Sequence, residues 1–364
     1  MAPPPLSDVP GGWPGAAAGD EARRRLVALA RWPLVLAPMA GGASTVDLVV
    51  AAARAGACGF LAGGYKTAAA VAEEMAGVRA AGVDAFGVNL FVPGEPTADP
   101  HGLATYVARL APEAAVLGTR LGEAVWDDDA YPAKVAALVA APPAAVSFTF
   151  GLPAAGTVRA LQAAGSLVLV TVTTPEEATA ALRLAPDGLV LQGSEAGAHR
   201  GSFVNADRPD QDRPVRALLA AVRRRTCLPL LAAGGVGGPE DVRDLLQRGA
   251  DLVAAGTAFL RCPESGAPQA HKEALGAVTS RTTAVTRAFS GRRARALVNA
   301  WVREHPDAPA AYPEINNATR PLRAAAASTR DAEHMSLYAG TAFDQAGTGS
   351  AAEVVARLVS GLSR

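Results

Sequence analysis

Cysteine is scarce in this sequence, and the few that occur show no metal-binding or redox pattern. The 364 residues include 3 cysteines, Cys58, Cys227 and Cys262. Their number is odd, and their spacing is neither that of zinc ligands nor that of a redox pair. Cys58 and Cys227 border strand-like apolar runs, where cysteine serves as a small buried hydrophobe. We therefore expect no metal site and a reducing, cytoplasmic setting.

The sequence also lacks an excess of charge and any long hydrophobic run. Lys plus Arg and Asp plus Glu number 34 each, so the formal net charge is zero. This balance gives no electrostatic reason to expect nucleic acid or an anionic membrane as a partner. No apolar run approaches the length of a membrane span. Residues 1–20 are rich in Pro, Gly and Ala and lack the features of a signal peptide, which predicts a flexible lead-in.

Aromatic residues make up only 5% of the chain, whereas 50% of it is hydrophobic. A core must therefore be built mainly from Ala, Val and Leu. The length is large for an average domain and normal for an elaborated α/β barrel.

Eight short apolar runs alternate with helical patterns along the chain. Because the runs are continuous, they suit parallel strands that are buried on both faces. Helix signals lie between them: Thr174-Pro175-Glu176-Glu177 is a capping box, Pro239 opens a helix, and Ser44 or Thr45 caps another. The pattern predicts an α/β fold, a (β/α)8 TIM barrel, with strands at Leu34–Ala37, Cys58–Leu61, Phe86–Phe91, Ala145–Phe150, Leu167–Val172, Gly188–Gln192, Leu228–Ala233 and Asp251–Ala255.

Two segments exceed a minimal barrel. Residues 100–143 hold more than one helix between the third and fourth strands. After the eighth strand, helical patterns at Lys272–Phe289 and Ala294–Glu304 predict a C-terminal helical lid or subdomain, and an amphipathic helix at Ala351–Leu362 would close the barrel. The predicted organisation is 1–20 as lead-in, 21–264 as barrel, 265–345 as lid and 346–364 as the closing segment.

The most informative segment is the loop Gln192–Gly201, which follows the sixth strand. It contains three glycines and presents His199 next to Arg200. Barrel enzymes place their chemistry where a buried strand ends, and an imidazole titrates near neutral pH, as proton transfer or anion binding requires. The alternative is a histidine on an ordinary surface loop. We expect the other histidines and the two arginine clusters to be solvated: His101, His271, His305, His334, Arg223–Arg225 and Arg292–Arg295. One arginine of the Arg292–Arg295 cluster could instead reach an anionic ligand from the lid.

Glycines follow the seventh and eighth strands, at Gly234-Gly235 and Gly256-Thr257. Backbone amides in these two loops form the phosphate site typical of this fold, although any one glycine would also suit a tight turn. Neither loop is a nucleoside triphosphate loop or a dinucleotide fingerprint. Asn89 and Gln192 lie at or near strand ends, where each amide would bond either a flat heterocycle or a structural partner. Glu195 fits better as an anchor for backbone amides.

Eight short segments occur in an order that is specific to one enzyme family, although each segment alone is a weak signal: Ala37–Gly42, Tyr65–Thr67, Phe86–Phe91, Val146–Gly151, Gln192–Gly201, Ala232–Val236, Gly249–Leu260 and Thr286–Arg292. Together they resemble the nitronate monooxygenases, formerly called 2-nitropropane dioxygenases, of the FMN-dependent barrel type. The similarity extends from about Leu34 to Gly340, which is nearly the whole chain.

The resemblance implies that FMN lies across the strand ends. Pro38, Met39 and Ala40 would pass along the isoalloxazine ring, with Asn89 and Gln192 near its polar edge. The residues implied at the ribityl phosphate are Gly197, Gly234, Gly235, Gly256 and Thr257.

His199 matches the active-site histidine of the family, and two nearby positions depart from the family pattern. Ala198 stands where a second glycine is usual, which would shift the loop that aims His199. Ala254-Ala255 replaces a usual Gln-Met or Gln-Leu, which removes a polar side chain near the flavin.

The activity that the resemblance implies is oxidative denitrification. A nitronate gives one electron to FMN, the flavin semiquinone reduces O2, and the adduct collapses to a carbonyl compound and nitrite. Substrates would be alkyl nitronates such as propionate 3-nitronate, or nitroalkanes. The enzyme is expected to be a monomer or a homodimer. His199 would be the base for a neutral nitroalkane or, when protonated, the partner of a nitronate. The lid would supply apolar walls, with Tyr312 as a contact.

Two other functions remain open. A flavin-dependent enoyl-(acyl carrier protein) reductase shares the glycine-loop histidine and the barrel. It would be reduced by NAD(P)H and would need a basic docking face, for which the Arg292–Arg295 cluster is the candidate. A non-catalytic flavin-binding barrel is the other, and the departures at Ala198 and Ala254 keep it open.

Overall fold

The apolar runs of the sequence form the strands of a closed barrel. The computed structural model describes residues 16–277 and 282–362. The strands pair in parallel in the order β1-β2-β3-β4-β5-β6-β8-β9, and β9 pairs with β1. The predicted (β/α)8 barrel is confirmed, with each strand end within two residues of its expected place: β1 (Leu34–Leu36), β2 (Cys58–Ala62), β3 (Phe86–Phe91), β4 (Ala145–Thr149), β5 (Leu167–Val172), β6 (Gly188–Gln192), β8 (Leu230–Ala233) and β9 (Leu252–Ala255).

Helices surround the barrel, and two of them begin at predicted caps. The Leu48 amide donates to Thr45 Oγ1 at 3.0 Å at the start of α2 (Val46–Arg54), so Thr45 and not Ser44 is the cap. The Glu177 amide donates to Thr174 Oγ1 at 3.1 Å at the start of α7 (Pro175–Leu182). The other helices of this layer are α3 (Ala68–Ala80), α5 (Tyr131–Ala140), α6 (Ala155–Ala164), α8 (Val215–Arg223), α9 (Pro239–Gln247) and α13 (Ala351–Leu358). The first helix, α1 (Ala16–Val27), instead packs Leu26 against the side chains of the barrel interior.

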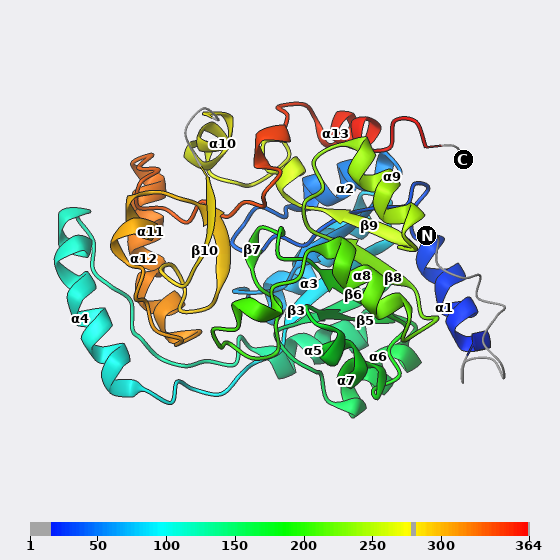
Figure 1. Cartoon of the computed structure of the whole chain (residues 1–364), viewed down its shortest axis with the longest axis horizontal. Coiled ribbons are helices and arrows are strands. Elements are labelled where there is room, and N and C mark those ends of the chain that lie inside the picture. Colours follow the sequence, from blue (N-terminus) through cyan, green and yellow to red (C-terminus); the bar gives the residue numbers. More distant parts are fainter. Residues whose placement is uncertain (1–15, 278–281, 363–364) are drawn as a thin grey trace.

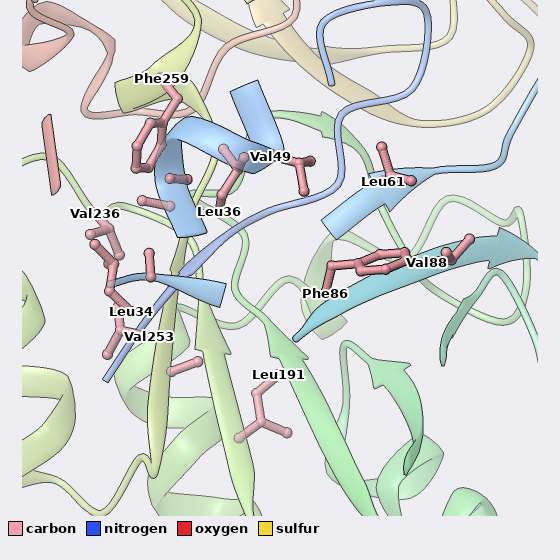
Figure 2. Close-up of a cluster of buried hydrophobic side chains, with 14 of the residues drawn as sticks. Leu34, Leu36, Val49, Leu61, Phe86, Val88, Leu191, Val236, Val253 and Phe259 are labelled. Carbon is pink, nitrogen blue, oxygen red and sulfur yellow. The ribbon is translucent and has the colours of Figure 1, made fainter. Parts of the chain in front are cut away.

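Side chains of the barrel strands alternate between the barrel interior and the surrounding helices. Leu34 and Leu36 of β1 pack outward in the large cluster that includes Val49 of α2 (Figure 2). The side chain between them, Val35, packs inward with Cys58. Cys58 is buried, which raises the pKa of its thiol to about 12 and confirms its role as a small hydrophobe. The floor of the site therefore rests on a tightly filled core.

The segment between β9 and α13 forms helices and a small sheet that lie at one end of the molecule (Figure 1). Its helices are α10 (Gln269–Gly276), α11 (Ala300–Glu304) and α12 (Glu314–Ser328), and α4 (Pro100–Val116) packs against α12. Strands β10 (Thr283–Thr286) and β11 (Ala294–Leu297) pair antiparallel, and β11 also pairs with β7 (Ala198–His199). His199 therefore lies on a short strand and not in a loop.

The purely helical lid that the sequence predicts is thus wrong for much of Lys272–Phe289 and for the start of Ala294–Glu304. β-branched residues at Thr283, Val285 and Thr286 favour extended backbone. The strand β7, which pairs with β11 on its other side, lies far away in sequence, so a local pattern carries no sign of that pairing. Residues 278–281 of the expected helix lie outside the described residues. Within the two described stretches, no helix is long and apolar enough to cross a membrane.

Candidate active site

The carboxyl ends of the barrel strands, the loops after them and the lid enclose a cavity of about 630 Å³. This is a size typical of small-molecule and cofactor sites. All the site residues expected from the sequence line it, although they come from five different barrel strands and the segments after them: Pro38, Met39, Ala40, Asn89, Gln192, Gly197, His199, Gly234, Gly235, Ala254, Ala255, Gly256 and Thr257.

The loops after β8 and β9 offer backbone donors at one end of this cavity. Gly234 and Gly235 have φ values of +120° and +69°, a region that favours glycine. A Cβ on Gly234 would also lie 3.1 Å from the Ala196 amide nitrogen. Among the described residues, none accepts a hydrogen bond from the amides of Gly234, Gly235 or Thr257. These amides fit a phosphate group, which accepts several such hydrogen bonds.

The two strand-end amides are bonded differently. Asn89 Nδ2 donates to Ser147 Oγ and Thr149 Oγ1, both at 2.9 Å, whereas its Oδ1 accepts from none of the described residues. Gln192 Nε2 donates to the His199 carbonyl at 2.9 Å, and Gln192 Oε1 accepts from the Gly201 amide at 2.7 Å. Gln192 therefore holds the His199 segment in place, and Asn89 keeps an acceptor for a ligand.

His199 is 9% exposed and lies among aromatic rings. Its ring centroid lies 5.8 Å from Phe150, 5.7 Å from Tyr312 and 5.3 Å from Tyr338. Its Nε2 is 2.7 Å from Ser290 Oγ. Burial, and then the charges of Arg292 and Arg323, lower the pKa of His199 to about 3. The imidazole is therefore neutral at pH 7, which is the protonation state of a base and not of a cationic anion partner.

The sequence predicts that the arginines before and on β11 are solvated, and this prediction is wrong. Arg292 is 6% exposed, and its Cζ lies 3.9 Å from the centroid of the Phe150 ring. Arg293 forms an ion pair with Asp212, and Arg295 Nε donates to the Ser194 carbonyl at 2.8 Å. The helix predicted at Ala294–Glu304 is wrong at its start because residues Ala294–Leu297 form β11, which pairs with β7.

The charge of the cavity wall is one-sided. Among the described residues that line it, none is Asp or Glu. Lys66 is paired with Glu74 at 2.6 Å, whereas Arg320 and Arg323 of α12 lack an ion pair with any described residue. The cavity is therefore suited to an anionic ligand.

Two of the four histidines expected to be solvated are buried. His271 is 6% exposed, lines the cavity and donates to the backbone of Tyr338, whereas its Nε2 has no partner in the described chain. Its burial lowers its pKa to about 4. His305 is 2% exposed, with Nε2 3.0 Å from Glu113 Oε2. His271 lies on α10 and His305 directly follows α11, and both side chains are buried in the lid. Their neighbours in sequence include polar residues, so the sequence carries no sign of this burial. Glu195 does anchor a backbone amide, as expected, at 3.0 Å from Val215 N.

The two departures from the family pattern lie at the cavity. Ala198 has a φ of +61°, which glycine adopts more readily than alanine. Ala254 and Ala255 line the wall of the cavity at the end of β9. Sequence reasoning missed Ser290, Phe150 and Tyr338. Ser290 and Phe150 do lie in the segments that carry the resemblance, which is the signal that would have marked them.

Comparison with known proteins identifies similar chains over nearly the full length. A family model described as "Nitronate monooxygenase" matches residues 23–361. A nitronate monooxygenase of Pseudomonas aeruginosa is 37% identical over 342 residues, which cover 91% of this chain and 96% of that protein.

Solved structures agree with this result. A nitroalkane oxidase from Streptomyces ansochromogenes has a TM-score of 0.89 and 43% identity, and the match covers 92% of this chain and 96% of that one. FabK from Thermotoga maritima has a TM-score of 0.67 at 21% identity, with 92% and 94% covered. The latter likeness concerns the fold alone.

Proposed function

Because the chain belongs to the nitronate monooxygenase family, we propose that it is an FMN-dependent enzyme that oxidises alkyl nitronates, such as propionate 3-nitronate, with O2. The products would be a carbonyl compound and nitrite. The family membership makes the chain an oxidoreductase. The cofactor and the substrate form are what we propose from its site.

The cavity wall is the observation that supports this proposal. It combines the open amides of Gly234, Gly235 and Thr257 with a neutral imidazole, two arginines and no described carboxylate. The amides would hold the FMN phosphate, and the ring would lie near Met39 and the Asn89 acceptor. FMN, when bound, accepts electrons from the substrate and passes them to O2.

The protein's own residues bind and orient the substrate. Arg320 and Arg323 would attract a nitronate, which is an anion, into the cavity. A nitronate has already lost its α-proton and needs no base. A neutral nitroalkane must lose that proton, and neutral His199 is placed to take it at its ring nitrogen. The Phe150, Tyr312 and Tyr338 rings around His199 exclude water from that transfer.

The experiment is a nitrite assay with oxygen uptake on the purified protein, after its absorption spectrum. We expect a flavin spectrum and nitrite release from propyl-1-nitronate. His199→Asn should lower kcat/KM for neutral 1-nitropropane by about 10²–10⁴-fold and change the nitronate reaction far less. His101→Asn, at an exposed position, is the matched control. A protein that stays colourless when mixed with FMN, or that forms no nitrite, would refute the proposal.

The reductase alternative needs a basic docking face, and its candidate arginines are mostly buried or ion-paired. Anaerobic mixing with NADPH separates the two activities. Slow or absent bleaching of the flavin favours the oxygenase, and rapid bleaching favours the reductase. Nitrite release also argues against a non-catalytic flavin-binding barrel.

A further inference from the structure

Arg292 is a buried cation at the back of the candidate active site. It lies just before β11, and it does not line the cavity. Its Nη2 donates to the Ser202 carbonyl, and its Nε contacts the Arg200 carbonyl at 3.5 Å. Its guanidinium faces the Phe150 ring at 3.9 Å and the Tyr312 ring at 5.8 Å. Carbonyl oxygens and ring faces are therefore its partners.

No carboxylate of the described chain lies within ion-pair distance of Arg292. Its neighbours differ, since Arg287 pairs with Asp207 and Arg293 pairs with Asp212. Glu177 acts on Arg292 only through space, since its carboxylate accepts hydrogen bonds from the Thr173 and Phe203 amides. A buried charge without an ion-pair partner is costly to the fold. Burial lowers the pKa of Arg292 to about 10, so the guanidinium stays charged at neutral pH.

Two connections join Arg292 to His199. Ser290 Oγ is 2.7 Å from His199 Nε2 and accepts a hydrogen bond from the Arg292 amide at 3.3 Å. The Phe150 ring lies next to both side chains, 3.9 Å from the guanidinium and 5.8 Å from the imidazole centroid. The charge of Arg292 thus lies behind the imidazole, on the protein side of the cavity.

The other titratable or charged groups near His199 do not cancel this charge. Arg323 of α12 adds a second positive charge that acts on the imidazole. The Tyr312 and Tyr338 phenols, next to the imidazole, are neutral because burial raises the pKa of each. The adjacent Arg200 is held by Asp212 at 3.4 Å.

We propose that Arg292 is a positioning residue of this site, whose fixed charge adds to burial in opposing protonation of His199 and raises the affinity of the cavity for an anionic substrate. The second part rests on the proposed function. A role limited to hydrogen bonding the carbonyls of Arg200 and Ser202 would need a donor at this position and not a charge.

The test compares Arg292→Gln, which keeps a hydrogen-bond donor without charge, with Arg292→Lys, which keeps the charge. Arg287→Gln removes a nearby, ion-paired arginine and is the control. In each full-length protein, the titration of His199 is followed by NMR of 13Cε1-labelled histidine, and His199→Asn assigns the signal. KM and kcat are measured with propyl-1-nitronate and 1-nitropropane.

We expect Arg292→Gln to raise the pKa of His199 by about one unit and the KM for the nitronate about tenfold, with little change for neutral 1-nitropropane. Arg292→Lys and Arg287→Gln should stay within about threefold of the parent KM and keep its His199 titration. Equal losses in Arg292→Gln and Arg292→Lys with an unmoved titration would overturn the inference. Where Arg292→Gln does not fold, Arg292→Lys decides alone: a retained KM supports the charge, and a raised KM with the parent titration overturns it.

The titration is read without turnover, so it tests Arg292 independently of the reaction. A parent protein that forms no nitrite refutes the proposed function alone. An unmoved His199 titration in Arg292→Gln refutes the role of Arg292 alone.

Discussion

At the scale of the residue, the protonation and orientation of His199 depend in part on side chains that do not line the cavity. Ser290 Oγ is 2.7 Å from His199 Nε2, and Ser290 is 1% exposed. The other ring nitrogen, Nδ1, has no partner among the described residues. Ser290 therefore fixes one side of the ring and leaves the other available for proton transfer.

Ser290→Ala should lower kcat with neutral 1-nitropropane about tenfold, because a base that loses its orienting partner spends less time in the reactive geometry. The nitronate, which needs no base, should be turned over nearly as before. Steady-state kinetics on both substrates checks this. Ser202→Ala, whose hydroxyl donates to the Val204 carbonyl and not to His199, is the control. Unchanged turnover of 1-nitropropane in Ser290→Ala would contradict the orienting role.

Gly234→Ala should weaken FMN binding by at least about tenfold. The new Cβ would lie 3.1 Å from the Ala196 nitrogen, at a φ of +120° that alanine rarely adopts, and the loop that offers its amides to the phosphate would move. Quenching of FMN fluorescence during titration measures the affinity. Gly156→Ala is matched to it, since the added Cβ there meets no atom within 4 Å. Equal FMN affinity in both variants would exclude this loop as the phosphate site.

At the scale of the element, buried parallel strands were predictable and the lid sheet was not. A strand such as Leu167–Val172 is covered on both faces, so its continuous apolar run is visible in the sequence. Strands β10 and β11 have four residues each, too few for a reliable period, and β11 also pairs with the distant β7.

The residues of the candidate site also divide into those that the sequence predicts and those that it does not. Loops at strand ends carry glycines and amides that mark them locally, and all of those residues line the cavity. Ser290 and Arg292 reach His199 only through the β7–β11 pairing, across 91 positions in the case of Ser290. A contact between such distant residues leaves no periodic trace in one sequence.

The sheet is attached to the barrel through Asp212, which contacts Arg200 after β7 and Arg293 before β11. Asp212→Asn should lower the free energy of unfolding by about 3 kcal/mol, because Arg200 is 2% exposed and would keep an uncompensated charge. Urea unfolding measures the loss. Asp307→Asn breaks the exposed pair with Arg109 and should cost at most about 1 kcal/mol. Similar losses in the two variants would mean that Asp212 does not hold the sheet.

At the scale of the whole molecule, the lid and the barrel share the cavity, so a ligand there should stabilise both. A ligand that binds only the folded state adds about 2.7 kcal/mol at a concentration 100 times its Kd. We expect saturating FMN to raise the melting temperature of the flavin-depleted protein by a few degrees in differential scanning calorimetry. Riboflavin, which lacks the phosphate, should raise it less. Equal increases in melting temperature with FMN and riboflavin would mean that the phosphate, and therefore the Gly234 and Thr257 amides, contribute nothing to binding.

The two buried imidazoles of this cavity also make the stability of the molecule depend on pH. The folded-state pKa is about 3 for His199 and about 4 for His271, lowered first by burial in both cases. In the unfolded chain both return to about 6.5. Below pH 6.5 the unfolded state therefore binds more protons than the folded state, and stability falls as the pH falls toward 4. Above pH 6.5 both groups are neutral in both states, so their contribution is flat.

We expect the free energy of unfolding to fall between pH 6.5 and 5 by up to about 1.4 kcal/mol per pH unit for each histidine. Urea unfolding at half-unit intervals measures the slope. His271→Gln removes one titrating group and should lower the slope by the share of one proton, whereas His101→Gln, at an exposed position, should leave it unchanged. An unchanged slope in His271→Gln would mean that this histidine takes up its proton in the folded state. The lid would then admit water to His271 in that pH range.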